Sequence, residues 1–216
     1  MALNSFVTSG LGAALLLVSG CAATATSAEF TADGDSLIFT GEIDGNTLGS
    51  LKRALRDNPG VTQIHLLEVP GSVDDEASLT ALADFIRRRD LITVVPSDGL
   101  VASGGTDMAL MGTTRIIEDG ACIGVHSWAV PTLLGYESGA DVPDSSPDHD
   151  LYLDFYESVD IPEDFYWFTL EAAGPEEIHW MSPEEINFFG LSVIPLDESL
   201  HETDRQRARR CDNRVW

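Results

Sequence analysis

Positive charge is scarce in this sequence of 216 residues. Lysine and arginine together number 12, and lysine occurs once, as Lys52, whereas aspartate and glutamate number 36, so the formal net charge is -24. Proteins that bind nucleic acids gain affinity from lysine and arginine side chains that neutralise phosphates, and anionic lipid headgroups need the same residues. The composition therefore predicts no nucleic-acid partner. It leaves open either an acidic surface suited to salty surroundings or an acidic face for one basic partner.

Charge is absent from the first 28 residues, where the apolar stretch FVTSGLGAALLLVSG ends at Cys21. A helix that spans a bilayer needs roughly 20 apolar residues, whereas a shorter stretch is typical of the core of an export signal. We therefore expect residues 1–28 to be a signal peptide, although no lysine or arginine precedes the stretch, as one does in most such signals. A buried N-terminal helix and simple cleavage after Ala28 are the alternatives.

The tetrapeptide VSGC at the end of this stretch resembles the lipobox of bacterial lipoproteins, in which the cysteine is acylated and becomes the first residue. The resemblance implies lipid attachment at Cys21 and a periplasmic protein anchored to a membrane of a Gram-negative bacterium. The other two cysteines are Cys122 and Cys211. In an oxidising compartment they can form a disulfide, but a buried, free Cys122 and an exposed Cys211 are equally compatible with the sequence.

Regular patterns predict one α/β domain over residues 29–200. Apolar runs rich in β-branched residues predict strands, and apolar residues at helical spacing predict helices. Strands joined by helical crossovers favour a largely parallel, buried sheet. The predicted strands are 36–43, 61–69, 91–95, 115–118, 121–128 and 191–195, and the predicted helices are 48–55, 79–89, 151–159, 163–174 and 183–189.

Two segments lack such patterns. Residues 129–150 collect glycine, proline, serine and aspartate, and we expect them to form an irregular loop. Residues 201–216 are expected to be a C-terminal tail on the surface. We predict no metal site and no cofactor, because the possible ligands within the loop show no recognised spacing. These residues are Asp144, Asp148, His149 and Asp150.

A serine stands in a turn of small residues in the stretch GLVASGGTDMAL, residues 99–110, between an apolar run and a predicted helix. At a helix start, Ser103 has unpaired amide hydrogens nearby, which suit a nucleophile that develops negative charge. The same position suits an ordinary N-cap. His126, in the apolar stretch IGVHSW, is a candidate base for this serine, or else a structural histidine of a strand.

The order of these motifs resembles a known family. A GEI strand, a PGSV turn, the ASGGT turn, GACIGVHSW and a late MSPEEINFFGL are similar to the Clp protease proteolytic subunit and signal peptide peptidase A, and most of all to their uncharacterised periplasmic relatives. The resemblance covers residues 36–195. It implies the fold of the crotonase superfamily, a spiral of β-β-α units.

The resemblance also implies the roles of individual residues. Ser103 corresponds to the nucleophile and His126 to the base, while the amides of Gly71 and Gly104 correspond to the oxyanion hole. The family usually has two glycines after the proline, whereas here Ser72 replaces the second, so either Gly71 or Ser72 presents the first amide. The acidic residue that orients the histidine is expected to be Glu177.

For that acidic role Glu176 is the second choice, because both glutamates precede the last predicted helix, where relatives often carry an aspartate. The implied function is an exported serine hydrolase, a peptidase that acts on a peptide or protein substrate without a cofactor. The sequence leaves open whether it assembles into homo-oligomers, as several relatives do, or works alone. The missing aspartate and the altered glycine pair favour an alternative, a catalytically silent binding or scaffold protein at the cell envelope. An acyl-CoA enzyme is disfavoured because its site needs cationic contacts to phosphates.

Overall fold

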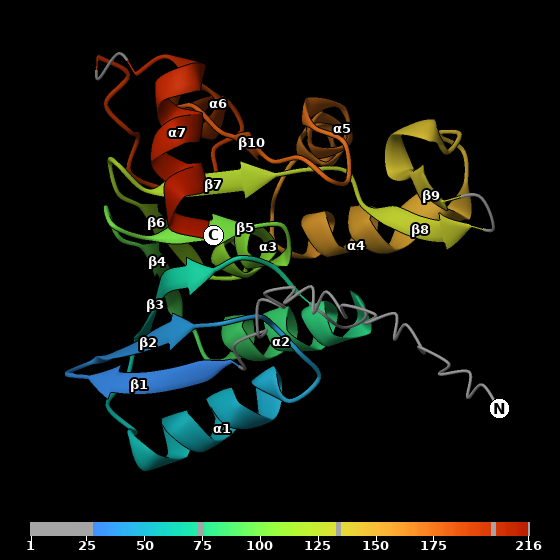
Figure 1. Cartoon of the computed structure of the whole chain (residues 1–216). Helices are drawn as coiled ribbons and strands as arrows, with labels where there is room; N and C mark the ends of the chain where they lie inside the picture. The colour runs from blue at the N-terminus through green and yellow to red at the C-terminus, as the bar shows by residue number, and fades with distance from the viewer. Residues whose placement is uncertain (1–27, 73–75, 133–134, 200–201, 216) are drawn as a thin grey trace, which may run out of the picture.

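Strands and helices alternate along most of the chain, as the sequence predicts (Figure 1). The structure is a computed structural model, which describes residues 28–72, 76–132, 135–199 and 202–215. The predicted signal peptide, apart from Ala28, and the lipobox cysteine Cys21 lie outside the described residues. None of the described helices combines the length and the apolar character that crossing a membrane requires.

An eight-stranded sheet forms the centre of the molecule, in the order β1-β2-β3-β5-β7-β10, and β4 pairs with both β3 and β6. The β1–β2 and β7–β10 pairs are antiparallel, and all the others are parallel. The sheet branches because the first half of β3 pairs with β4 and its last two residues pair with β5. The strands are β1 (Glu29–Asp33), β2 (Ser36–Thr40), β3 (Gln63–Val69), β4 (Ile92–Val95), β5 (Leu100–Ala102), β6 (Thr114–Ile117), β7 (Cys122–Val125) and β10 (His179–Trp180).

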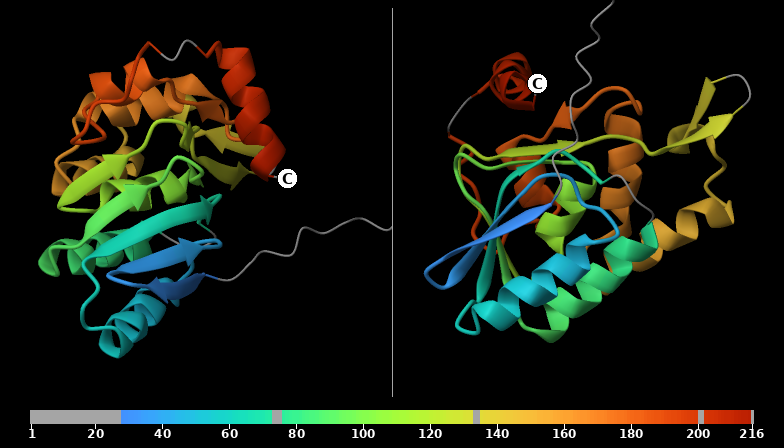
Figure 2. Two further views of the ribbon diagram at one scale, coloured as in Figure 1. Left: turned by 90° about the vertical axis from the view of Figure 1, so that its left-hand side faces the viewer. Right: turned by 60° about the horizontal axis from the view of Figure 1, so that its bottom comes forward.

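Helices cover the sheet on both sides, and α1, α2 and α4 lie side by side on one of them (Figure 2). The short helix α3 contacts α2, β3 and β5 and is almost wholly buried. α5 packs on α4, and α6 and α7 lie at the top of the view in Figure 1, away from α1. The helices are α1 (Thr47–Asp57), α2 (Glu76–Arg88), α3 (Gly104–Leu110), α4 (Asp150–Ser158), α5 (Glu163–Ala172), α6 (Pro183–Phe188) and α7 (Asp204–Val215).

The core consists of the apolar faces of the strands and helices, at positions where the sequence pattern predicts them. Ile64 and Leu66 of β3 and Leu51 of α1 are fully buried, as expected for the alternation of a strand and the spacing of a helix. Burial of each such side chain stabilises the fold by about 1.5–3 kcal/mol relative to its exposure. A capping box begins α6, since Ser182 and Glu185 each accept a hydrogen bond from the other's backbone amide.

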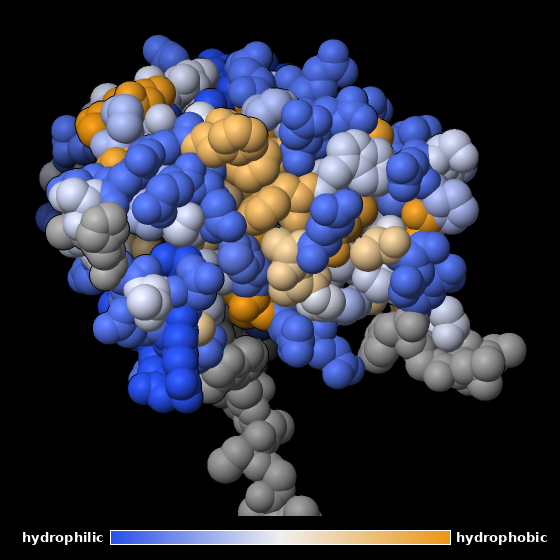
Figure 3. Space-filling model, turned by 90° about the horizontal axis from the view of Figure 1, so that it is seen from above, coloured by the Kyte–Doolittle hydropathy of each residue, from blue (hydrophilic) through white to orange (hydrophobic). Residues whose placement is uncertain are grey.

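Figure 3 shows apolar side chains gathered near the middle of the face above α5 and α6. Phe188 of α6 is 80% exposed and lies edge-on to Phe189 at a centroid distance of 5.0 Å. Phe189 in turn packs on Phe168 of α5, also at 5.0 Å. The aromatic core thus continues to the surface at this face.

The predicted closing strand at residues 191–195 is wrong. The segment makes a backbone hydrogen bond from Val193 N to Arg115 O of β6, at 2.9 Å, but has no strand ladder among the described residues. The free edge of β7 is taken by β10 instead, with His179 opposite Val125. A two-residue strand carries no periodicity, so the sequence pattern could not identify it.

Residues 129–150 are more regular than predicted. They contain the hairpin of β8 (Ala129–Thr132) and β9 (Gly135–Ser138), followed by the short 3-10 helices η1 (Gly139–Asp141) and η2 (Pro147–His149). His149 at the end of this segment is buried, and its Nδ1 lies 2.6 Å from the Tyr166 hydroxyl of α5. The segment is therefore packed on the domain through the contact of His149 with α5. Its composition, which is typical of a loop, does not indicate this contact.

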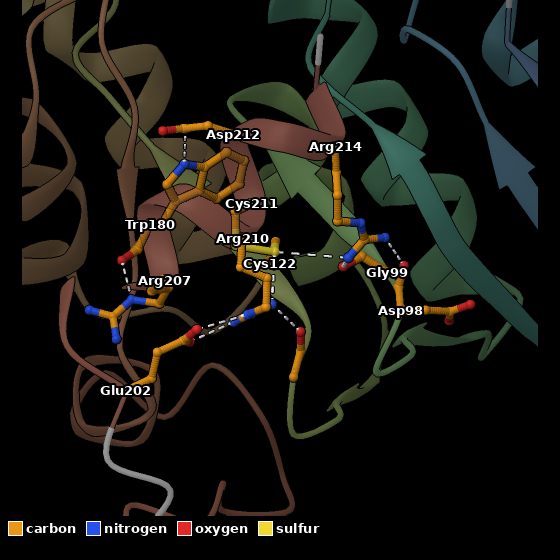
Figure 4. The surroundings of a disulfide bond; sticks show 11 residues. Asp98, Gly99, Cys122, Trp180, Glu202, Arg207, Arg210, Cys211, Asp212 and Arg214 are labelled. Carbon is orange, nitrogen blue, oxygen red and sulfur yellow. Dashed lines mark hydrogen bonds and ion pairs between the residues drawn. A yellow bond between two sulfur atoms is a disulfide. The ribbon is translucent and has the colours of Figure 1, made fainter. Parts of the chain in front are cut away.

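The predicted C-terminal tail forms the helix α7, which lies on the surface with many residues exposed and is docked on the domain (Figure 4). Cys211 of α7 forms a disulfide with Cys122 of β7, and both cysteines are fully buried. Arg207 donates to Trp180 O at 2.8 Å, and Arg210 donates to Gly120 O at 2.6 Å. The arginines thus donate to backbone carbonyls of β10 and of the turn before β7, which explains why so basic a segment lies against the protein.

We expect loss of the disulfide to destabilise the protein by about 2–5 kcal/mol, because the bridge closes a loop of 89 residues in the unfolded chain. Urea unfolding of the oxidised protein and of the Cys122→Ser/Cys211→Ser double variant measures the difference. Reductant should lower the wild-type midpoint and leave that of the double variant unchanged. Equal midpoints for fully oxidised and fully reduced wild type would contradict the prediction.

Candidate active site

Ser103 and His126 follow the carboxyl ends of two neighbouring parallel strands. β5 pairs with β7 so that Ala102 lies opposite Gly124, and Ser103 N donates to Gly124 O at 3.1 Å. Residues that follow adjacent parallel strands meet at one edge of the sheet, the usual place for a site in such folds. Both side chains line one pocket of about 320 Å³. The sequence prediction that these two residues share a site is consistent with this placement.

Ser103 has a backbone conformation that side-chain-bearing residues rarely adopt, with φ 53° and ψ -130°. Such a conformation costs of the order of 1–3 kcal/mol and is found preferentially at functional sites. The carbonyl of Ser103 accepts hydrogen bonds from Thr106 N at 2.8 Å and Asp107 N at 3.2 Å. Its side chain makes no capping hydrogen bond to the described helix α3, so the N-cap interpretation lacks the interaction on which it depends.

The two glycines after Ser103 are required by close packing. A Cβ on Gly105 would lie 2.0 Å from Val69 O, and one on Gly104 would lie 2.6 Å from the Ser72 hydroxyl. The start of α3 is therefore pressed directly against the end of β3 and the turn that follows it.

This contact also brings the candidate oxyanion donors together. Gly71 O accepts a hydrogen bond from Ile43 N at 3.0 Å, and in a trans peptide the following N–H points the opposite way. The Ser72 amide consequently points away from Ile43, and a Cβ on Gly104 would lie 3.2 Å from it. Between the two alternatives for the first donor, this geometry favours Ser72, beside the predicted amide of Gly104.

His126 is oriented by a backbone carbonyl. Its Nδ1 lies 2.8 Å from Ser127 O, and a carbonyl only accepts, so Nδ1 carries the proton and Nε2 is left as the acceptor. Ser127 is itself held in place, because its amide donates to Ala173 O at 2.9 Å and its hydroxyl lies 2.8 Å from that of Ser138. In the part of the chain that the structure describes, no hydrogen bond joins the side chains of Ser103 and His126.

Glu177, expected to orient the histidine, is not brought to it. Glu176 and Glu177 are exposed in the turn before β10, and neither is hydrogen-bonded to His126 among the described residues. The partner of the His126 Nδ1 among the described residues is the Ser127 carbonyl.

The pocket contains an acidic residue that the sequence analysis did not identify. Asp107 lies four residues after Ser103 on α3, and its Oδ1 accepts a hydrogen bond from the Tyr156 hydroxyl at 2.7 Å. Burial raises the pKa of this carboxyl to about 6, and the Tyr156 hydrogen bond opposes the rise. Residues four apart share a helix face, so the position was visible in the sequence although its burial was not.

Aromatic side chains from three segments complete the pocket wall: Trp128, Tyr152, Tyr156 and Tyr166. Tyr152 of α4 stacks on Trp128 at a centroid distance of 5.9 Å and on Tyr166 of α5 at 5.6 Å. The indole of Trp128 donates to the Tyr166 hydroxyl at 2.8 Å. No group of three or more metal-binding side chains is found among the described residues.

No protein-family model matches the chain, and no curated protein matches it. Solved structures do match. The 1510-N membrane-bound stomatin-specific protease, as a mutant in complex with a substrate peptide, is 16% identical, with 74% of each chain covered and a TM-score of 0.50. The ClpP protease catalytic domain from Plasmodium falciparum is also 16% identical, over 78% of this chain and 87% of its own, with a TM-score of 0.50.

The chain has a Clp-protease-like fold. The fold predicted from the order of the motifs is thereby confirmed. At these identities the likeness concerns the arrangement of the elements, and the Clp-protease-like fold by itself assigns no chemistry to Ser103 or His126.

The raised pKa of Asp107 makes the stability of the fold depend on pH. The pKa of Asp107 is about 6 in the folded protein, whereas its usual value, which we expect in the unfolded chain, is 3.8. Between these two pH values the folded protein binds more protons than the unfolded chain, so wild type loses stability relative to Asp107→Asn as the pH rises. A shift of about 2 pKa units corresponds to about 3 kcal/mol at most. Urea unfolding of both proteins from pH 4 to 7.5 measures the difference, which should level off above pH 6; a constant difference would contradict the assignment.

Proposed function

We propose that this protein is a serine peptidase in which Ser103 is the nucleophile and His126 the general base. The observation that carries the proposal is the backbone of Ser103, held at φ 53° between β5 and α3 and beside a pocket that His126 also lines. A sharp strand-to-helix turn of this kind exposes a serine hydroxyl to a substrate. The proteolytic function of proteins with the same fold supports the reaction class.

In the proposed reaction the Ser103 oxygen attacks the carbonyl carbon of a peptide bond while its proton passes to Nε2 of His126. The carbonyl oxygen becomes an oxyanion, which the amides of Ser72 and Gly104 stabilise. The C–N bond then breaks, and the leaving amine takes the proton from Nε2. Water hydrolyses the resulting ester by the same steps, which restores the Ser103 hydroxyl and releases the acid.

The acid component of the site is replaced in this proposal by a backbone carbonyl. Ser127 O fixes the tautomer of His126, which is one of the two tasks of the carboxylate in a triad, but it carries no full negative charge to stabilise the imidazolium. The site is therefore a Ser-His dyad. Glu177, an exposed residue before β10, takes no part in this proposal.

The rival function is a catalytically silent protein that binds a peptide with the same pocket. It is favoured by one observation, that Ser103 and His126 are not hydrogen-bonded to each other within the described residues. The dyad requires the two side chains to come within about 3 Å of each other when substrate binds. Covalent labelling separates the two functions.

A fluorophosphonate probe should label wild-type protein at one site, and intact-mass measurement should show the added phosphonyl group. Ser103→Ala should abolish labelling with little change in the melting temperature, because no capping bond is lost. Ser72→Ala is the matched control, since Ser72 lines the same pocket and uses its amide alone, so labelling should persist. A folded wild type that is not labelled would favour the silent protein.

The rate of labelling should also distinguish the base from the predicted acid. His126→Ala should slow it by about 10²–10⁴-fold, the usual contribution of a general base. Glu176→Gln and Glu177→Gln should leave the rate unchanged, because neither carboxylate contacts the imidazole. A hundredfold loss in Glu177→Gln would instead restore the triad that the sequence predicts.

A further inference from the structure

The pocket beside Ser103 has a charged group in its wall, the carboxyl group of Asp107. Asp107 of α3 lies four residues after Ser103, and both line the pocket. Oδ1 accepts the hydrogen bond from Tyr156 at 2.7 Å. None of the ion pairs among the described residues includes Asp107, so its charge is not neutralised within that part of the chain.

A carboxylate without a cationic partner is costly in a buried place. With the pKa of Asp107 at about 6, the group is largely ionised at neutral pH, and its negative charge faces a pocket rather than bulk water. A bound cation would remove this cost, and the interaction would be strong because the site is partly desolvated.

Aromatic rings surround the same space. Tyr152, Tyr156, Tyr166 and Trp128 all line the pocket, and ring faces attract ammonium and guanidinium groups. The Tyr156 hydroxyl, whose pKa burial raises well above its usual value, stays protonated and so holds Asp107 in one orientation. A carboxylate among aromatic rings is the chemistry that recognises an organic cation.

We propose that this pocket is the specificity site of the enzyme and that it binds the cationic side chain of a lysine or arginine of the peptide substrate. The proposal rests on the peptidase function of Ser103, since it places the scissile carbonyl next to the bound residue. The net charge of -24 acts in the same direction, because an acidic protein attracts cationic peptides and raises their rate of association.

The first experiment measures binding without catalysis. Full-length protein carrying Ser103→Ala is titrated with N-acetyl-arginine amide and with N-acetyl-citrulline amide, its neutral isostere, by calorimetry. The arginine compound should bind about tenfold or more tightly, the worth of a charged hydrogen bond. Equal affinities, or no measurable binding of either compound, would overturn the proposal.

Two further variants test whether the carboxylate causes the preference. Asp107→Asn keeps the size of the side chain and an acceptor for Tyr156, and it should bind both compounds equally. Asp154→Asn is the matched control, because it removes one negative charge from an exposed position of α4 outside the pocket, and it should retain the preference for arginine. A preference that survives in Asp107→Asn would show that another group recognises the cation.

The second experiment uses wild type and peptide amides with arginine, lysine, citrulline or leucine before the scissile bond. Hydrolysis should favour the two cationic residues, with the effect lost in Asp107→Asn; faster cleavage after leucine would overturn the specificity. If no peptide is cleaved although the arginine compound binds, the peptidase function fails and the cation site stands. The peptidase proposal is thus tested by hydrolysis and the cation-site proposal by binding, so that either can fail without the other.

Discussion

Ala102 and Gly124 lie opposite each other in the parallel pairing of β5 with β7, and the candidate site follows from this register. It places Ser103 and His126 at the same sheet edge, and it lets the Ser103 amide bond Gly124 O. A slip of one residue would turn His126 to the other face of the sheet. The neighbouring strand β3 positions the candidate oxyanion donor, because the turn after β3 places the Ser72 amide next to the start of α3.

The site stores strain and uncompensated charge in a small volume. Ser103 adopts an unfavourable backbone conformation, and Asp107 is half-buried, with a pKa that burial raises to about 6. Each costs stability that other parts of the fold must supply. The aromatic packing of α4 and α5 forms one wall of the pocket, whereas the disulfide and the docked arginines of α7 stabilise the opposite end of β7 and the neighbouring strand β10.

Much of this arrangement was predictable from local patterns, since the turn at Ser103, the apolar strand before His126 and the capping box at Ser182 all have signatures within a few residues. The features that were missed depend on contacts far apart in the chain. Asp107 is buried by Tyr156, which is 49 residues away in sequence. The partner of His126 is a backbone carbonyl, which every residue carries and which therefore leaves no mark in a sequence. β5 is three residues long and wholly buried, too short to show a period.

The two glycines after Ser103 are required by packing, which affects how the evolution of this fold can be followed from sequences. Gly104 and Gly105 are held by packing against Ser72 and Val69, and this requirement persists whether or not a reaction takes place at the pocket. A descendant that had lost hydrolysis would keep both glycines and would first accumulate changes at the Ser103 hydroxyl and the His126 ring, which the packing does not require. Among diverged copies of this chain, the glycine pair therefore marks the inherited architecture, and only the two polar side chains record whether the chemistry is still under selection.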